Sequence, residues 1–250
     1  HDINYLSRAG ITWAAGRSES GPSLYNFQIA DVAGGSMNAV SAILAAIIYR
    51  ERTGEGQFID VSMQDSVIPF NSMDGAAYFA GGPMPARESG LLNGGGIYDF
   101  YETADGRYMS VGSLEPKFFA ALCEAMGHPE WKDGKILRTE AAVVKQTFRE
   151  VFRTKTQKEW VEIFSTLDAC VEPVMDLQEV SDDEHLLHRG MWPEVQIPLS
   201  DGVTIKQMGC PVHLSKCPPR YTHAGYPEGY HTEEILTSLG YAKEEIDTMV

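Results

Sequence analysis

The most regular hydrophobic pattern in the chain lies between residues 36 and 50. Apolar side chains recur there every three or four residues with alanines between them, at Met37, Val40, Ile43, Leu44, Ile47 and Ile48. This spacing predicts an amphipathic helix, which Gly54 would end. The alternating segment 57–63 then predicts a β-strand. Together the two elements indicate a sheet-covering unit of an α/β domain.

A second patterned block follows the chain-breaking cluster at residues 81–85. The alternating segments 97–102 and 107–112 flank Ala104-Asp105-Gly106 and predict a β-hairpin. Helical spacing follows at 116–127 and 140–153, and Thr156 and Glu159 have the spacing of a capping box. A short strand is predicted at 171–174. The order of these elements indicates a small α+β domain.

The breaks between blocks divide the chain into four predicted segments. Residues 1–66 belong to a large domain, and residues 67–93 form a linker with a helix in its first half. The small domain takes residues 94–180. Residues 181–250 form a return linker, a β-rich stretch and two short C-terminal helices that pack on the large domain. Within the first segment, residues 11–26 are rich in glycine and small polar residues and predict a loop.

Composition narrows the classes of partner. A formal net charge of −15 argues against a nucleic-acid-binding protein, which usually carries a basic face. No uninterrupted apolar run reaches the roughly 20 residues that span a bilayer, so no membrane partner is expected. The cysteines form no C-x-x-C pair and the histidines show no zinc spacing, which favours reduced thiols and no metal. A cytoplasmic location is expected, since neither a signal peptide nor a peroxisomal Ser-Lys-Leu ending is visible.

Candidate chemistry begins with His1 and Asp31. Asp31 precedes the pair Gly34-Gly35 at the mouth of the long helix, where glycines allow close approach of a ligand and the helix start supplies free N–H groups. Imidazole and carboxylate are also common proton-transfer groups. The local pattern alone favours simpler structural roles: Asp31 as a helix cap and His1 as a frayed terminus.

Two further features are open to alternative interpretations. Glu115 stands where the second hairpin strand turns into a helix, so it suits a cap or an acid that complements the helix dipole. The run Gly94-Gly95-Gly96 suits a hinge at least as well as a mobile active-site loop.

Several motifs in fixed order resemble one enzyme family. They are His1-Asp2-Ile3-Asn4-Tyr5, Asp31-Val32-Ala33-Gly34-Gly35, Arg52-Thr53-Gly54-Glu55-Gly56-Gln57 and Glu115-Pro116-Lys117-Phe118-Phe119. A weaker likeness covers Glu159-Trp160, Val171-Glu172-Pro173-Val174 and His231-Thr232-Glu233-Glu234-Ile235-Leu236. As a set they resemble the family III CoA-transferase superfamily of the CaiB/BaiF type, and within it the α-methylacyl-CoA racemases.

The resemblance implies an α/β fold. A Rossmann-like, CoA-binding large domain, to which residues 1–66 contribute, is joined by linkers to the small α+β domain. In the family an N-terminal nucleotide-binding half precedes the motif at His1, so the chain is expected to be a fragment of a longer enzyme of lipid metabolism. Much of the CoA site would lie in that half, and no CoA-binding residue is assigned. Family members are interlocked dimers, so a homodimer is expected.

The resemblance also implies roles for His1, Asp31 and Glu115. His1 and Asp31 would stand on opposite sides of the α-carbon of a 2-methylacyl-CoA thioester, one removing the α-proton and the other returning a proton through an enolate. Backbone N–H groups near Asp2 would hold the charge on the thioester oxygen. Glu115 would hydrogen-bond His1 and set its tautomer. No metal and no cofactor are expected beyond the coenzyme A of the substrate.

One position departs from the family pattern, and two alternatives remain. In the racemases an asparagine four residues before the catalytic aspartate steadies it; Phe27 stands there, and the neighbouring Asn26 receives no role. In the related CoA-transferases the position of Asp31 is the nucleophile, and Gly94-Gly95-Gly96 keeps that alternative open. From another class, the chain could be an inactive dimerising fragment.

Overall fold

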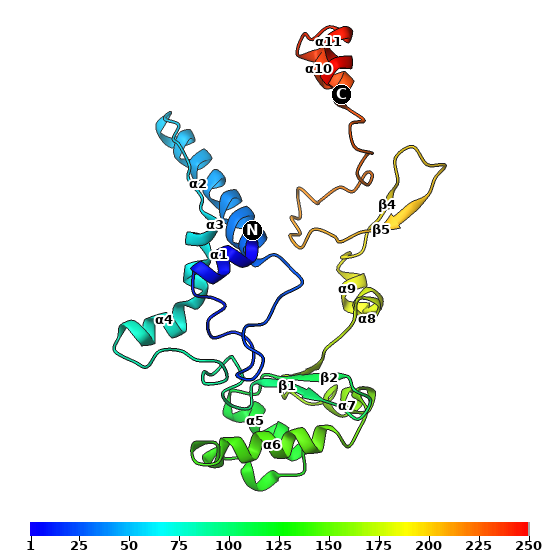
Figure 1. Ribbon diagram of the computed structural model, residues 1–250. Helices are drawn as coiled ribbons and strands as arrows, with labels where there is room; N and C mark the ends of the chain where they lie inside the picture. Colours follow the sequence, from blue (N-terminus) through cyan, green and yellow to red (C-terminus); the bar gives the residue numbers. More distant parts are fainter. Residues whose placement is uncertain (250) are drawn as a thin grey trace. The chain divides into compact units, whose positions relative to one another are not determined.

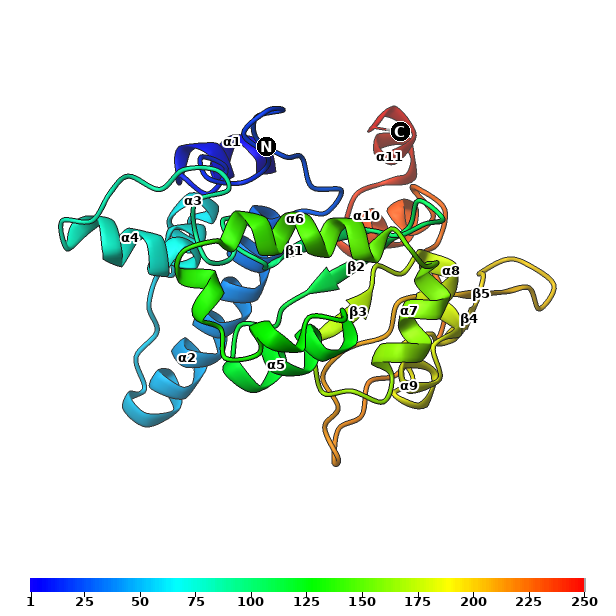
Figure 2. The same cartoon turned by 90° about the horizontal axis from the view of Figure 1, so that it is seen from below.

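The computed structural model describes residues 1–249, which form two compact units, His1–Val174 and a second that begins at Met175 (Figures 1 and 2). The first unit contains α1 (Asp2–Arg8), the π-helix η1 (Ile29–Ser36), α2 (Met37–Thr53), α3 (Met63–Val67), η2 (Ile68–Asn71), α4 (Ser72–Phe79), β1 (Asp99–Glu102), β2 (Tyr108–Val111), α5 (Pro116–Ala125), η3 (Pro129–Trp131), η4 (Lys135–Arg138), α6 (Ala141–Phe152), α7 (Gln157–Phe164) and β3 (Val171–Pro173). The fold is therefore a mixture of helix and sheet, which agrees with the predicted fold class.

The predicted small α+β domain is built on an antiparallel sheet in the order β1-β2-β3. Phe100 lies opposite Ser110, which in turn lies opposite Glu172. Side chains on the other face of the sheet are buried with side chains of α5, α6 and α7: Tyr101, Met109, Val111, Val171, Phe119, Leu122, Phe148, Phe152, Trp160 and Phe164. Alternation along the strands thus separates one packed face from one open face.

The ends of the small-domain helices follow the predicted signals. Pro116 occupies the first turn of α5, where its missing N–H costs nothing. The capping box at the start of α7 is confirmed, because Thr156 accepts from the Glu159 backbone N–H while the Glu159 carboxylate accepts from the Thr156 backbone N–H. The indole N–H of Trp160 donates to the Phe152 carbonyl at 2.8 Å inside the aromatic core.

The N-terminal elements have a much smaller core. Leu6 of α1, Ala30 of η1 and Val67 of α3 are its buried members. A methyl group added to Gly34 would lie 2.7 Å from the Val67 Cγ1 atom, so this glycine permits the close approach of η1 to α3. The contact is tight, but it is local.

The predicted long helix is confirmed, but its surroundings differ from the prediction. No residue of α2 is buried, and Figure 1 shows it extending away from α1 and α3. The predicted strand at 57–63 is wrong: residues 57–62 lie in no strand, and α3 begins at Met63. An alternating segment becomes a strand only where a neighbour supplies a hydrogen-bonded ladder, and no such neighbour occurs within residues 1–249.

Within the described chain, one helical run, Ile29–Thr53, is long and apolar enough to cross a membrane by length and composition. It meets this criterion although polar residues interrupt every apolar run. The core helix of a soluble protein meets it too, and η1 already packs on α1 and α3. The run consists of η1 and α2, and no residue of α2 is buried.

The second unit is small and loosely built from short elements. It contains α8 (Leu177–Asp182), α9 (Glu184–His188), β4 (Glu194–Gln196), β5 (Thr204–Lys206), α10 (Thr232–Ser238) and α11 (Lys243–Met249). Strands β4 and β5 pair antiparallel, with Val195 opposite Ile205. The Asp183 carboxylate caps α9 by accepting from the Leu186 backbone N–H. The two predicted C-terminal helices are confirmed; the boundaries of the four predicted segments stay a prediction.

Candidate functional site

A carboxylate joins the first helix to the segment that carries Asp31. The Asp2 Oδ1 atom accepts hydrogen bonds from the backbone N–H of Ala30 at 2.6 Å and of Asp31 at 3.0 Å. These are among the N–H groups at the start of η1 that have no partner inside their helix. Since Asp2 is the first residue of α1 and His1 is its N-cap, this bond docks the end of the chain that carries His1 on η1.

Asp31 is not the cap of its helix. The N-cap of η1 is Gln28, and its side-chain Nε2 atom donates to Asp31 Oδ2 at 2.9 Å. Gln28 therefore supplies the amide donor that the sequence pattern lacked at Phe27, while Asn26 makes no side-chain hydrogen bond within residues 1–249. A spacing of three residues at a helix start places two side chains together, and this was the signal available in the sequence.

Glu115 also does not act as a side-chain cap. It occupies the N-cap position of α5 with extended backbone, but its carboxylate makes no capping hydrogen bond and is exposed. No hydrogen bond or ion pair joins Glu115 to His1 anywhere in the described chain. The structure thus links His1, Asp2 and Asp31 through α1 and η1, and does not bring Glu115 into direct contact with them.

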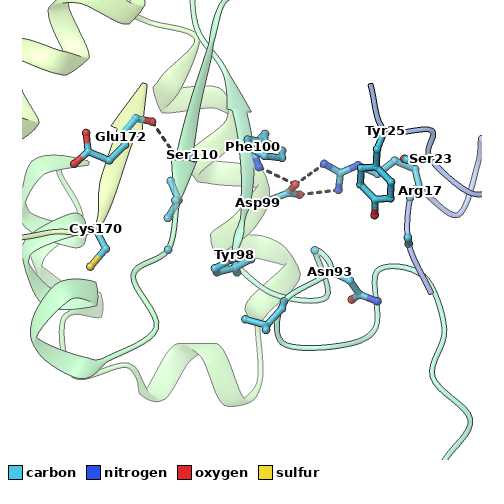
Figure 3. Close-up of a pocket in the computed structure, with 16 residues that line it drawn as sticks. Arg17, Ser23, Tyr25, Asn93, Tyr98, Asp99, Phe100, Ser110, Cys170 and Glu172 are labelled. Atoms are coloured by element: carbon cyan, nitrogen blue, oxygen red, sulfur yellow. Dashed lines mark hydrogen bonds and ion pairs between the residues drawn. The ribbon is translucent and has the colours of Figure 1, made fainter. Parts of the chain in front are cut away.

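A pocket of about 720 Å³ lies on the open face of the three-stranded sheet (Figure 3). Its floor includes the cross-strand row of Phe100, Ser110 and Glu172, together with Tyr98 and Cys170. Burial raises the pKa of the Cys170 thiol, and the nearby Glu115 carboxylate adds to the effect. The thiol is therefore held in its neutral form, and Glu115 lies near this edge of the pocket.

The opposite wall comes from two loops. Arg17, Ser23 and Tyr25 belong to the predicted loop that precedes η1, and Asn93 and Gly94 belong to the glycine-rich loop before β1 (Figure 3). The Asn93 side-chain amide donates to the Ala14 carbonyl at 3.1 Å, which ties the two loops together.

A buried carboxylate anchors this wall. Asp99 points to the helix-covered side of the sheet, where Arg17 binds it through both terminal nitrogens, one of them at 2.9 Å. Lys145 of α6 lies 2.6 Å away, and the Arg149 guanidinium lies at 3.5 Å. Burial raises the pKa of Asp99, but hydrogen bonds from Arg17 and Lys145 outweigh it and hold the pKa below the ordinary value. The carboxylate is therefore ionised at neutral pH.

The sequence interpretation missed this group, although a signal was present. Asp99 and Tyr101 share the buried side of β1, and Lys145 falls beside Val144 on the inward face of α6. A charged residue on an otherwise apolar face indicates an internal partner, because burying an unpaired charge is costly. When two such positions of opposite charge occur in elements that pack together, each indicates the other as its partner.

The glycine run is held closely. Gly94 has a φ of +87° and its carbonyl accepts from the Lys145 ammonium. A methyl group at Gly95 would lie 2.6 Å from the Gly90 carbonyl oxygen, so this position has no room for a side chain. Both contacts favour a packed turn over a free hinge.

Comparison with known proteins identifies the family of this chain. The profile of CoA-transferase family III matches residues 1–232. The α-methylacyl-CoA racemase of Mus musculus is 33% identical over 249 residues, which cover 98% of this chain. A succinyl-CoA:mesaconate CoA-transferase of Haloarcula marismortui is 29% identical over 96% of the chain and 60% of its own length.

Solved structures agree on the fold. A CAIB/BAIF family protein from Brucella suis superposes with a TM-score of 0.74 at 19% identity, over 96% of this chain and 62% of its own. The described chain also spans 64% of the length of the mouse racemase. The matched relatives include both racemases and transferases, so the comparison gives the family and leaves the reaction open.

Proposed function

Because this chain belongs to CoA-transferase family III, we propose that it carries the catalytic groups of an enzyme that racemises 2-methylacyl-CoA thioesters. The observation that supports this reaction is the pair of hydrogen bonds from Ala30 and Asp31 to Asp2, which docks the helix that follows His1 on the segment that carries Asp31. An acid/base pair on two adjoining elements suits a reaction in which one group removes a proton and another returns one.

The proposed steps use His1 and Asp31 in turn. One takes the α-proton of the thioester, and the C–H electron pair moves into an enolate whose oxygen is held by the backbone N–H groups near Asp2. The other delivers a proton to the opposite face of the α-carbon. Gln28 holds one oxygen of Asp31 through its amide, which leaves the other oxygen available for the proton.

Glu115 has a supporting part in this proposal. Its carboxylate makes no capping bond and is exposed, so it is available to orient His1 if the parts of the enzyme close on each other, within one chain or between two. The proposal includes the Rossmann-like CoA-binding domain and the homodimer implied by the family resemblance, and the cytoplasmic location expected from the sequence. The relatives' greater length supports a CoA site that needs more chain than residues 1–249.

The test is exchange of the α-hydrogen in deuterated water. Incubating a 2-methylacyl-CoA with the enzyme should place deuterium at the α-carbon, detected by mass spectrometry. Asp31→Asn should lower the rate by roughly 10² to 10⁴-fold, the usual contribution of a general acid or base. The matched control is Asp74→Asn, an acid in the first turn of α4, which should leave the rate unchanged.

The same assay tests Glu115 and the competing transferase. Glu115→Gln should lower exchange by about 10²-fold without affecting folding, whereas unchanged kinetics would return Glu115 to a structural role. A transferase is favoured by the partly exposed Asp31 carboxylate, which could attack the thioester carbonyl, release the CoA thiolate and form a mixed anhydride. CoA transfer to a free acid without α-exchange would establish that reaction, and the absence of both activities, together with a dimer in sedimentation, would support an inactive dimerising fragment.

A further inference from the structure

We propose that Asp99 is a positioning residue. Its salt-bridge cluster clamps one end of the loop 18–28, so that Ser23 and Tyr25 form a preformed wall against which the acyl part of the thioester binds. The inference rests on the proposed function for its ligand. The clamp itself is a property of this chain and is testable without any activity.

The loop is held at two ends by two different acids. At its far end Arg17 is bound by Asp99, and at its near end Ala30 and Asp31 are bound by Asp2. Between them the described residues from 22 to 28 are exposed. With so little packing of its own, the loop depends on its ends for order. Asp2 acts beside the proposed chemistry, whereas Asp99 acts at a distance from it.

The far clamp centres on two buried groups, Asp99 and Lys145, whose contacts are shared with several elements. The Asp99 side chain is 3% exposed and that of Lys145 is 11% exposed. Asp99 also accepts from the Phe100 backbone N–H at 2.8 Å, so both its oxygens are occupied. Lys145 bridges Asp99 to the Gly94 carbonyl, which ties the glycine-rich loop to the same point. The clamp therefore joins β1, α6 and both loops of the pocket wall.

A second acid, Glu88, also binds Arg17. Glu88 lies 3.1 Å from the Arg17 guanidinium and accepts from the Ser18 backbone N–H at 2.9 Å. Glu88 has a φ of +53°, a conformation that side chains rarely adopt and that persists only where contacts hold it. The Arg87 guanidinium also donates to the Ala15 carbonyl at 3.2 Å.

The contacts of Arg17 indicate that it holds the loop in place. Both terminal nitrogens of its guanidinium already donate to carboxylates, to Asp99 and to Glu88. These hydrogen bonds engage Arg17 within the wall and direct it away from a ligand. Glu172 adds a further acid to the pocket floor, while the remaining floor and wall include Tyr25, Tyr98 and Phe100. The wall therefore suits an uncharged acyl group.

The primary test uses Arg17→Gln in the full chain, which releases the loop while leaving Asp99 paired with Lys145. Hydrogen–deuterium exchange followed by mass spectrometry should show the hydrogen-bonded backbone amides of Ser18 and Gly21, within the peptide 18–25, exchanging at least about tenfold faster. Peptides from α7 and β3 should be unchanged. The matched control is Glu102→Gln. Glu102 lies in the same strand, β1, and forms an exposed ion pair with Arg153, so its replacement should leave the loop unaffected.

Asp99→Asn is the second variant, and it should loosen residues 18–25 together with residues 93–96. If this variant does not fold, Arg17→Gln alone decides. Unchanged exchange in the loop, or equal acceleration throughout the core, would overturn the clamp and reduce the cluster to a general stabiliser.

The kinetic arm separates the two ends of the loop. With a 2-methylacyl-CoA that has an apolar chain, Arg17→Gln should raise KM by about tenfold and change kcat less than about threefold, because a disordered wall loses preorganisation while Asp31 stays clamped. Asp2→Asn should lower kcat instead. A drop in kcat without a change in KM for Arg17→Gln contradicts the proposal. If the wild-type enzyme shows no α-exchange, the proposed function fails, and the amide-exchange result still decides the clamp.

Discussion

The small α+β domain and the region around α2 have similar hydrophobic patterns but different surroundings. Helix α6 buries Val144, Phe148 and Phe152 against the sheet, whereas α2 buries none of its residues. Both helices repeat apolar residues at helical spacing. The difference lies in what covers them: β1, α5 and α7 pack against the buried side of α6, while within residues 1–249 little chain reaches α2. A helical pattern thus indicates an apolar face that must pack against something, but it does not identify which element or chain packs there.

The largest effect on stability is expected from disrupting the packed core of the small domain. Phe148→Ala removes a fully buried ring that lies 6.5 Å from Phe119 and 6.0 Å from Trp131. Large-to-small changes of this kind cost about 3–5 kcal/mol, so thermal unfolding of the domain should occur at a much lower temperature. Val143→Ala, on the exposed side of the same helix, is the control and should cost less than about 1 kcal/mol. Similar losses for both variants would contradict the packing described for α6.

The next effect concerns the charged group in the same domain and depends on pH. Hydrogen bonds hold the folded-state pKa of Asp99 below its ordinary value of 3.8, so its ionised form stabilises the fold above that pH. The contribution is lost as the pH falls through the lower folded-state pKa. Asp99→Asn should cost about 3 kcal/mol at pH 7, because Lys145 loses its buried partner.

Urea unfolding of Asp99→Asn and wild type across a pH series checks this sign. The difference between the two free energies of unfolding should be largest near neutral pH and shrink in acid below the ordinary carboxyl range. A difference that grows on acidification would mean that the folded state favours the protonated carboxyl group.

A smaller effect is expected at a tight contact in the sparsely packed region. Gly34→Ala places a methyl group 2.7 Å from Val67 Cγ1 and 3.3 Å from the Met63 carbonyl oxygen. Overpacking of this kind costs about 1–3 kcal/mol. Amide exchange in η1 and α3 should accelerate while the small domain is unchanged. Gly56→Ala has open space around it and serves as the control.

The smallest effect should come from the open helix itself. Leu44→Ser on α2 replaces a side chain that is 55% exposed, so the free energy of unfolding of this chain should change by less than about 1 kcal/mol. A cost above about 2 kcal/mol would show that the face of α2 is covered in solution. Sedimentation of the same variant would then report whether a second copy provides the cover.

Local signals in the sequence predicted much of the small domain. The hairpin, the proline at the start of α5 and the Thr156–Glu159 capping box depend on near neighbours in the chain, so the pattern was sufficient. The strand predicted at 57–63 failed because strands require a distant partner. The same reason applies to the candidate site: His1 and Asp31 were identified from motifs, but the hydrogen bonds from Ala30 and Asp31 to Asp2 depend on how α1 meets η1.

The Asp99 cluster lay beyond motif reading because its members are far apart in the chain. Arg17, Glu88 and Lys145 come from a loop, a second loop and a helix, and only the fold brings them to one carboxylate. It was predictable that a buried charge would have a partner of opposite charge. The identity of the partners was not, because several arginines and lysines were available.

The indole of Trp160 has a practical consequence for spectroscopy. It is 1% exposed among Phe152 and Phe164, whereas the indole of Trp13 is 59% exposed and donates to the Pro85 carbonyl at 2.7 Å. A ring fixed in an asymmetric aromatic surrounding gives a near-ultraviolet dichroism signal, while a ring open to water emits at longer wavelength and is reached by a soluble quencher. Single-tryptophan variants that retain one or the other indole would therefore give the small domain and the N-terminal loop separate optical signals.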